Sequence, residues 1–243
     1  MKPVIGVPLR YEYSKKDKPI LYMNEYVRRT LQRAGSIVLP IPPLKDVNYM
    51  ETSGDKFEPL TDEEKEVIEN YLNMCNGIFL PGGIKFTPND RYLLDQAIEK
   101  ELPILGVCLG MQMMSCYKED VNIEENKKEV NHNQEDESIL LHKVKISKDS
   151  KLYEILGVEE FLVNSFHKRY ATKNHIYKTV GYSSDGLIEA IEFPTSTFNI
   201  GVQWHPEISY SFDDNSKKII DCFVEAARLF QNSNKKKNTI EIE

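Results

Sequence analysis

Short apolar runs alternate with amphipathic segments throughout the first half of the chain. The runs are rich in β-branched residues, and the segments between them carry apolar residues at helical spacing. This alternation is typical of parallel strands that crossover helices connect, so the sequence predicts an α/β fold with a central, mostly parallel sheet and helices on both faces. The expected strands cover 3–9, 36–43, 77–81 and 103–108, and the expected helices cover 22–34, 61–74, 90–101 and 109–117.

The second half holds shorter strand candidates separated by turn signals, followed by a helix at 215–231. These strand candidates cover 142–146, 161–166, 179–183, 187–193 and 200–204. The polar stretch 118–138 shows no periodicity, so we expect an exposed, mobile loop whose role stays open. We therefore expect one domain over residues 1–231, with a small antiparallel β element in its second half and a disordered tail at 232–243.

Composition excludes several classes of partner. The 243 residues carry a formal net charge of −7, whereas a nucleic-acid surface needs clustered Lys and Arg. The N-terminus lacks the apolar core of a secretion signal, and no apolar run has membrane-spanning length. The four cysteines form no CxxC pair or dense framework, which is typical of reduced thiols. We expect a cytoplasmic protein that binds small molecules or proteins, not nucleic acid or membrane.

One cysteine stands in a sharply defined setting. In GVCLG, Gly106 and Gly110 flank Cys108 where an apolar strand is expected to meet a helix. This is the pattern of a nucleophile elbow, in which small neighbours let the backbone turn sharply and the helix N-terminus favours a thiolate. The alternative is that the glycines only fit the strand to the helix and the cysteine fills the core.

Two further features would complete a site for attack on a carbonyl. Pro81-Gly82-Gly83 ends the preceding strand candidate, and adjacent parallel strands end at the same edge of a sheet. The amide of Gly83 can thus face the thiol beside the amide of Leu109, as donors to a developing oxyanion. Taken alone, most such glycine pairs are ordinary turns.

The stretch GVQWHPE at 201–207 places His205 and Glu207 two residues apart after an apolar strand. In extended chain this spacing puts both side chains on one face, so Glu207 can orient the imidazole of His205. A single histidine in this position is more often an ordinary surface residue. Together with the elbow, however, the pattern favours a Cys108–His205–Glu207 catalytic triad.

These motifs resemble the class I glutamine amidotransferase-like family (peptidase C26). Within it, the chain is most similar to the γ-glutamyl-γ-aminobutyrate hydrolase branch, over nearly everything from Lys2 to Phe230. The motifs that carry the resemblance are KPVIGV, EYVRRTLQRAGSIVLPIPP, GIFLPGG, PILGVCLGMQ, VNSFHKRYA, DGLIEAIE and GVQWHPE, in that order. The resemblance implies a flavodoxin-like core.

The resemblance also implies a role for individual residues. Cys108 would be the nucleophile, His205 the acid and base, and Glu207 its partner. The amides of Gly83 and Leu109 would form the oxyanion hole. The implied substrate-binding residues are Gly82, Gln112, Ser165, Phe166 and His167. Alternatively, Gln112 faces solvent on its helix and NSFH is only a turn.

Three departures from the hydrolase branch lie near the expected pocket. Lys85 stands where that branch usually has Asp, and Leu109 stands where it often has Arg, as in amidotransferases that channel ammonia. HKR, at 167–169, replaces HHQ. We expect the added charges of Lys85 and Arg169 to favour a leaving group with a carboxylate, unless both cations only lie on the surface, and the effect of Lys168 on substrate preference stays open.

The implied activity is hydrolysis of the γ-glutamyl amide bond in a small γ-glutamyl compound, through a γ-glutamyl thioester. We expect no cofactor and no metal, since the sequence shows no Cys/His cluster. The main alternative is a glutaminase subunit that delivers ammonia to a separate synthase partner, and a third is a non-catalytic member of the fold. The amine, the pathway and the oligomeric state, including a homodimer, stay open.

Overall fold

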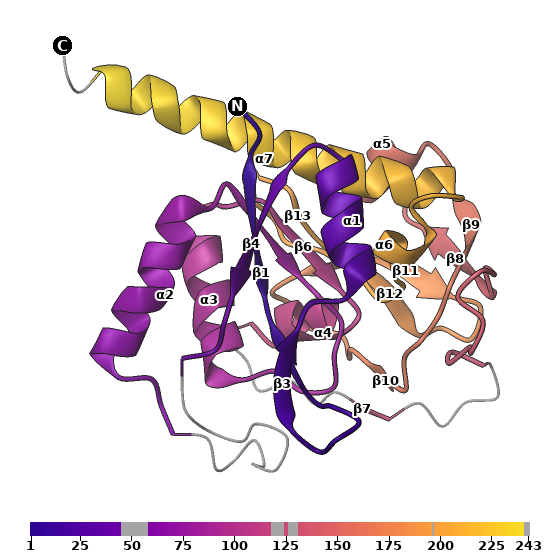
Figure 1. Cartoon of the computed structure of the whole chain (residues 1–243). Helices are drawn as coiled ribbons and strands as arrows, with labels where there is room; N and C mark the ends of the chain where they lie inside the picture. Colours follow the sequence, from indigo (N-terminus) through magenta and orange to yellow (C-terminus); the bar gives the residue numbers. More distant parts are fainter. Residues whose placement is uncertain (45–57, 118–123, 126–130, 196, 241–243) are drawn as a thin grey trace.

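A computed structural model describes residues 1–44, 58–117, 124–125, 131–195 and 197–240 (Figure 1). Its centre is a nine-stranded sheet with the order β4-β1-β5-β6-β13-β12-β11-β8-β9. These strands, in the same order, are Ile37–Ile41, Val4–Pro8, Gly77–Leu80, Ile104–Val107, Asn199–Val202, Ile188–Glu192, Lys178–Ser183, His142–Ile146 and Glu160–Val163. The sheet is parallel from β4 to β13, and each later pairing is antiparallel.

The mostly parallel α/β architecture predicted from the sequence is therefore confirmed. The expected antiparallel element is present in the second half, where β12, β11, β8 and β9 continue the parallel sheet from its β13 edge. This continuity has a simple cause: β12 pairs with β13 along Ala190 to Glu192, so the two halves of the chain share one sheet.

Helices cover both faces of the sheet (Figure 1). The helices are α1 (Glu25–Arg33), α2 (Asp62–Met74), α3 (Pro88–Glu99), α4 (Leu109–Ser115), α5 (Lys151–Leu156), α6 (Pro206–Ser209) and α7 (Asp214–Ile240). Side chains alternate along each strand. In β5, Phe79 therefore joins the core formed with α1, α5 and α7, whereas Ile78 and Leu80 join the core formed with α2, α3 and α4.

Local sequence explains where these helices begin. Asn24 caps α1 by accepting a hydrogen bond from the Tyr26 amide. Thr61 and Glu64 form the capping box that the sequence predicts for α2. A second capping box, between Thr87 and Asp90, starts α3 at Pro88, two residues before its predicted start.

Several elements differ from the prediction. Residues Arg10–Tyr13 (β2) and Pro19–Tyr22 (β3) form an unpredicted hairpin, and the short pair β7 (Glu124–Glu125) and β10 (Arg169–Tyr170) is also new. Helix α7 continues to Ile240, past the expected end at 231, because no Gly or Pro interrupts it. Residues 241–243 lie outside the described residues.

The predicted loop 118–138 is described only in part, since 118–123 and 126–130 lie outside the described residues. Its last portion is held in place. The carbonyl of His132 accepts hydrogen bonds from the Ser165 hydroxyl and the His167 amide, and the Gln134 amide donates to the carbonyl of Ser165. His132 and Gln134 are thus buried against 165–167, contrary to the expectation of an exposed loop, whereas Asn131, Asn133 and residues 135–138 are exposed as expected.

No helix in the described part of the chain combines the length and the apolar character that crossing a bilayer requires.

Candidate active site

Cys108 lies at the junction of β6 and α4 in a conformation that few side chains adopt. Its φ is 51° and its ψ is −106°, so a residue other than glycine sits in a strained turn. A Cβ on Gly110 would lie 2.1 Å from the carbonyl oxygen of Leu80, and one on Gly106 would lie 2.6 Å from the sulfur of Met114. The flanking positions thus have no room for a side chain, as an elbow requires.

Parallel pairing of β6 with β13 brings the histidine to this cysteine. Val107 pairs with Val202, and the amide of Cys108 donates a 2.8 Å hydrogen bond to the Val202 carbonyl. The chain then leads directly to His205, whose imidazole lies beside Cys108 in the lining of one cleft. Two residues far apart in the chain therefore meet at one edge of the sheet.

His205 also contacts Glu207. Its Nδ1 lies 2.7 Å from Oε1 of Glu207, whose side chain is only 4% exposed. Burial lowers the pKa of His205, but the charge of Glu207 and the hydrogen bonds to Cys108 and Glu207 outweigh this and raise it to about 10. The backbone differs from the expected extended chain, because Pro206–Ser209 forms the helical turn α6.

Two polar residues that the sequence analysis missed hold this pair in place. The side chain of Asn164 is fully buried; its Nδ2 donates to the His205 carbonyl and its Oδ1 accepts from the His205 amide, both at 2.8 Å. The hydroxyl of Thr30 on α1 donates to the carbonyl of Glu207 at 3.0 Å. Both residues lie within motifs that carry the resemblance, VNSFHKRYA and EYVRRTLQRAGSIVLPIPP, but their role was not predicted because each acts on backbone distant in sequence.

Gly82 and Gly83 lie against the same centre. A Cβ on Gly82 would stand 2.7 Å from Cε1 of His205 and 3.6 Å from Cβ of Cys108, and one on Gly83 would stand 3.1 Å from the Leu109 side chain. The absence of side chains at both glycines therefore leaves the thiol and the imidazole accessible.

Buried Arg10 fixes the orientation of this glycine turn. Its guanidinium donates to the carbonyls of Pro81 at 2.9 Å and Gly82 at 3.2 Å, while Asp90 holds it at 2.7 Å. In a trans peptide the N–H points opposite to the C=O. The Gly83 N–H consequently points away from Arg10. Arg10 was not among the predicted site residues, because it lies in the unpredicted hairpin.

The predicted substrate-binding residues have different surroundings in the structure. Phe166 packs its ring edge-on against His205, with centroids 5.5 Å apart. Gln112 is buried, not solvent-facing, and donates to the Arg169 carbonyl and to Gln203. The Ser165 hydroxyl is bound to the His132 carbonyl. The side chain of His167 lies in a buried group with three other residues that could hold a metal ion: His132, His142 and Glu189.

Two clefts meet at the thiol and share Gly83, Ile84, Cys108 and Phe166. The first cleft also has Gly82, His205 and Glu207 in its lining. Exposed Lys168 and Arg169 line the second cleft, with Gln112. Lys85 lines a neighbouring pocket with Arg10 and Thr87. Two of the three added cations therefore border a cleft that contains Cys108.

Curated proteins similar to this chain include both hydrolase and synthase relatives. A glutamine amidotransferase-like protein of Lactococcus lactis is 28% identical over 66% of this chain and 78% of its own length. The γ-glutamyl-γ-aminobutyrate hydrolase of Escherichia coli K12 is 25% identical over 68% and 77%. CTP synthase of Thermotoga maritima is 31% identical over 62% of this chain but only 35% of its own length.

Solved structures share the fold. A GMP synthase subunit from Thermoplasma acidophilum superposes with a TM-score of 0.64 at 16% identity, covering 97% of this chain and 98% of that one. The glutaminase domain of Trypanosoma brucei CTP synthase, with bound acivicin, gives 0.63 at 18% identity, covering 93% and 94%. The Peptidase C26 model matches residues 58–207, from just before α2 to Glu207, and this chain therefore belongs to the Peptidase C26 family of glutamine amidotransferase-like hydrolases.

Proposed function

We propose that this protein hydrolyses the γ-glutamyl amide bond of a small γ-glutamyl compound, with Cys108 as nucleophile, His205 as acid and base and Glu207 as its partner. The observation that carries the proposal is the position of His205, which lines one cleft with Cys108 and is hydrogen-bonded to Glu207 through Nδ1. A histidine with a pKa of about 10 is protonated at neutral pH, so it can stabilise a thiolate beside it.

The first half of the reaction releases the amine. The Cys108 thiolate forms a C–S bond to the γ-carbonyl carbon, and the amides of Gly83 and Leu109 donate to the oxygen that becomes negative. Protonated His205 then gives its proton to the departing nitrogen as the C–N bond breaks. The amine leaves, and a γ-glutamyl thioester remains on Cys108.

The second half regenerates the enzyme. His205, now neutral, takes a proton from water as the oxygen attacks the thioester carbonyl. The C–S bond breaks, the thiolate returns and glutamate leaves. Every step uses groups of this chain and water. The clefts on the two sides of Cys108 provide separate space for the glutamyl part and for the amine.

The direct test is a product assay with purified protein, glutamine and a panel of γ-glutamyl amines. The expected result is release of glutamate by the wild type and its loss in Cys108→Ala. Cys222→Ala is the matched control, since this second thiol lies on α7 and burial raises its pKa. Activity retained in Cys108→Ala contradicts the proposal.

The second candidate is a glutaminase that supplies ammonia to a separate synthase. Leu109, directly after the nucleophile, and the 31% identity to CTP synthase favour it. The same assay separates the two candidates. A free-standing hydrolase should turn over γ-glutamyl amines without a partner, whereas a subunit should accept only glutamine and stay nearly silent alone.

A further inference from the structure

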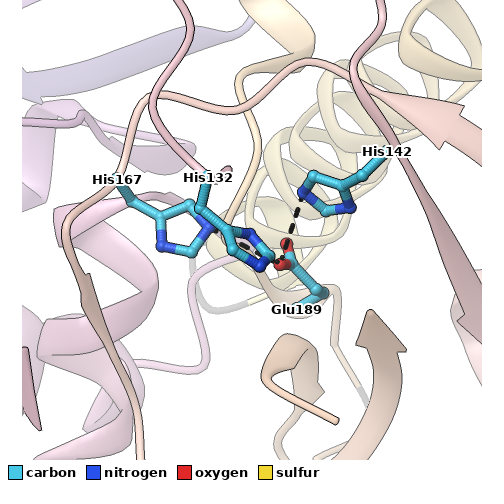
Figure 2. Close-up of side chains that lie close together, drawn as sticks. All are labelled: His132, His142, His167 and Glu189. Atoms are coloured by element: carbon cyan, nitrogen blue, oxygen red, sulfur yellow. Dashed lines mark ion pairs between the residues drawn. The ribbon is translucent and has the colours of Figure 1, made fainter. Parts of the chain in front are cut away.

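Three histidines and one glutamate from four separate segments converge in the interior (Figure 2). His142 begins β8, Glu189 lies in β12, and His132 and His167 lie in the two segments that pack together after α4 and β9. Their potential ligand atoms all lie within 4.8 Å of one another, and no side chain of the four is more than 7% exposed. The four are called the His3Glu cluster below.

The inward-facing atoms of the cluster have no hydrogen-bond partner. Nδ1 of His132, Nε2 of His142 and Nε2 of His167 lie 3.4, 3.6 and 3.5 Å from Oε1 of Glu189. All of these atoms, and Oε2 of Glu189, are buried and unpaired within the described residues. Leaving so many buried polar atoms unpaired is costly, so this arrangement indicates a missing shared partner at the centre.

The outward-facing nitrogen of each of the three rings is hydrogen-bonded to an oxygen. Nε2 of His132 lies 3.1 Å from the Asp185 carboxylate. Nδ1 of His142 lies 3.3 Å from the Lys143 carbonyl, and Nδ1 of His167 lies 3.0 Å from the Arg169 carbonyl. Because these oxygens only accept hydrogen bonds, each outer nitrogen carries the proton. The inner nitrogens of neutral rings then present lone pairs, which is how second-shell acceptors orient histidines that bind metals.

We propose that the His3Glu cluster is the binding site for one divalent transition-metal ion of the Zn²⁺ type, held by His132, His142, His167 and Glu189. Three imidazoles and one carboxylate suit such an ion, and its charge would balance the buried carboxylate. Ligands about 2.1 Å from a tetrahedral centre stand about 3.4 Å apart. The measured nitrogen-to-Oε1 separations of 3.4 to 3.6 Å match this spacing.

Hydrogen bonds from protonated histidines to Glu189 explain the geometry of the cluster less well than a bound metal ion does. An imidazolium that donates to a carboxylate lies about 2.7–2.9 Å from it. All three inner nitrogens are farther from Oε1 of Glu189, and they surround it at nearly equal distances. An oxygen that stands about equally far from three nitrogens, all within 4.8 Å of one another, is placed as one corner of a tetrahedron around a cation.

The role of the ion is structural. Four protein ligands fill a tetrahedral shell, so no position at the ion is open to a substrate. The ion would cross-link four segments of the second half, including the one that follows β9. Phe166, beside the ligand His167, packs against His205 and lines both clefts. The metal would thus fix one wall of the cleft without touching the reacting atoms.

The test is to measure the metal content of the protein without an affinity tag. This measurement does not depend on enzyme activity. Because the thiolate of Cys108 and the imidazole of His205 can also bind zinc, the experiment uses protein that carries Cys108→Ser. After removal of metal with a chelator, the protein should take up about one equivalent of Zn²⁺ and gain thermal stability. Co²⁺ in its place should give the visible ligand-field bands of a tetrahedral site.

Two variants and a control make the assignment specific. Glu189→Gln should lose stoichiometric binding, and Asp185→Asn should weaken affinity about 10- to 100-fold by removing a second-shell acceptor. His175→Ala removes an exposed histidine outside the cluster and should bind as before. Absence of tight Zn²⁺ and Co²⁺ binding overturns the proposal, as does equal uptake by Glu189→Gln. Neither result bears on whether Cys108 is the nucleophile.

Discussion

Nδ1 of His205 lies 2.7 Å from a carboxylate oxygen of Glu207, in a pair that Asn164 and Thr30 hold through the backbone of both residues. The imidazole has one nitrogen committed to the carboxylate, so its other nitrogen faces Cys108. This arrangement fixes the ring orientation before any substrate arrives.

Replacement of Glu207 by Gln should lower kcat on the order of 10²- to 10⁴-fold. The amide keeps the shape of the side chain but removes the charge that holds the pKa of His205 high and the acceptor that orients its ring. Glu154→Gln, on an exposed face of α5, is the control and should leave kcat unchanged. Equal kcat values for Glu207→Gln and the wild type would exclude this role for Glu207.

The pKa of His205 sets the alkaline limit of activity. Since folding raises this pKa above its usual 6.5 to about 10, protonated His205 stabilises the fold fully below about pH 6.5, and this stabilisation is lost as pH rises through 10. The proton for the leaving amine disappears over the same range. A profile of kcat/KM should therefore fall with an apparent pKa near 10, and Glu207→Gln should move the fall to lower pH. A profile unchanged by that substitution contradicts the assignment.

Arg10→Lys should reduce kcat on the order of 10²-fold, with little change in KM. The lysine keeps the charge beside Asp90, but it cannot donate to the Pro81 and Gly82 carbonyls together, so the Gly83 amide loses its fixed orientation. Arg28→Lys on the exposed face of α1 is the matched control. Unfolding by urea should be followed in both variants. A fall in kcat that merely tracks lost stability would argue against a positioning role.

Gly110→Ala should destabilise the fold by about 3 kcal/mol and abolish activity, because the new Cβ would overlap the Leu80 carbonyl and push α4 with the Leu109 amide off the sheet. Gly157→Ala is the comparison: its positive φ of 73° is strained, but nothing lies within 4 Å of the new Cβ. It should cost only about 1–2 kcal/mol and keep activity. Denaturant unfolding and glutamate release measure both effects.

Local patterns were sufficient to predict much of the fold. Apolar runs marked β1, β5 and β6 because strands buried on both faces need continuous apolar sequence, and the edge strand β4, in which only Ile41 is buried, carries a similar run. The hairpin of β2 and β3 was missed, since Ile20 and Leu21 are exposed there and no alternating apolar pattern marks it. Continuation of the sheet through β12 depends on pairing between distant segments, which periodicity does not report.

The candidate site was predictable only where a motif concentrates its chemistry. GVCLG and GVQWHPE mark Cys108, His205 and Glu207 within a few residues. Asn164 and Arg10 act on backbone groups far away in sequence, so only folding reveals them. The His3Glu cluster was not predicted for the same reason. Each of its four ligands lies on a different segment, and their spacing in the sequence matches no known zinc motif.

The two exposed cations that border the second cleft should select the leaving group. A carboxylate on the departing amine would meet Lys168 and Arg169 in the cleft that also contains Cys108 and Gln112. Exposed ion pairs contribute up to about 1 kcal/mol each, so Lys168→Ser and Arg169→Ser should each lower kcat/KM for carboxylate-bearing γ-glutamyl compounds by up to about fivefold and leave neutral ones unchanged. The loss should shrink as salt rises. Lys85→Ser is the control in the neighbouring pocket, and equal losses for neutral and charged leaving groups would assign the two cations to packing instead of selection.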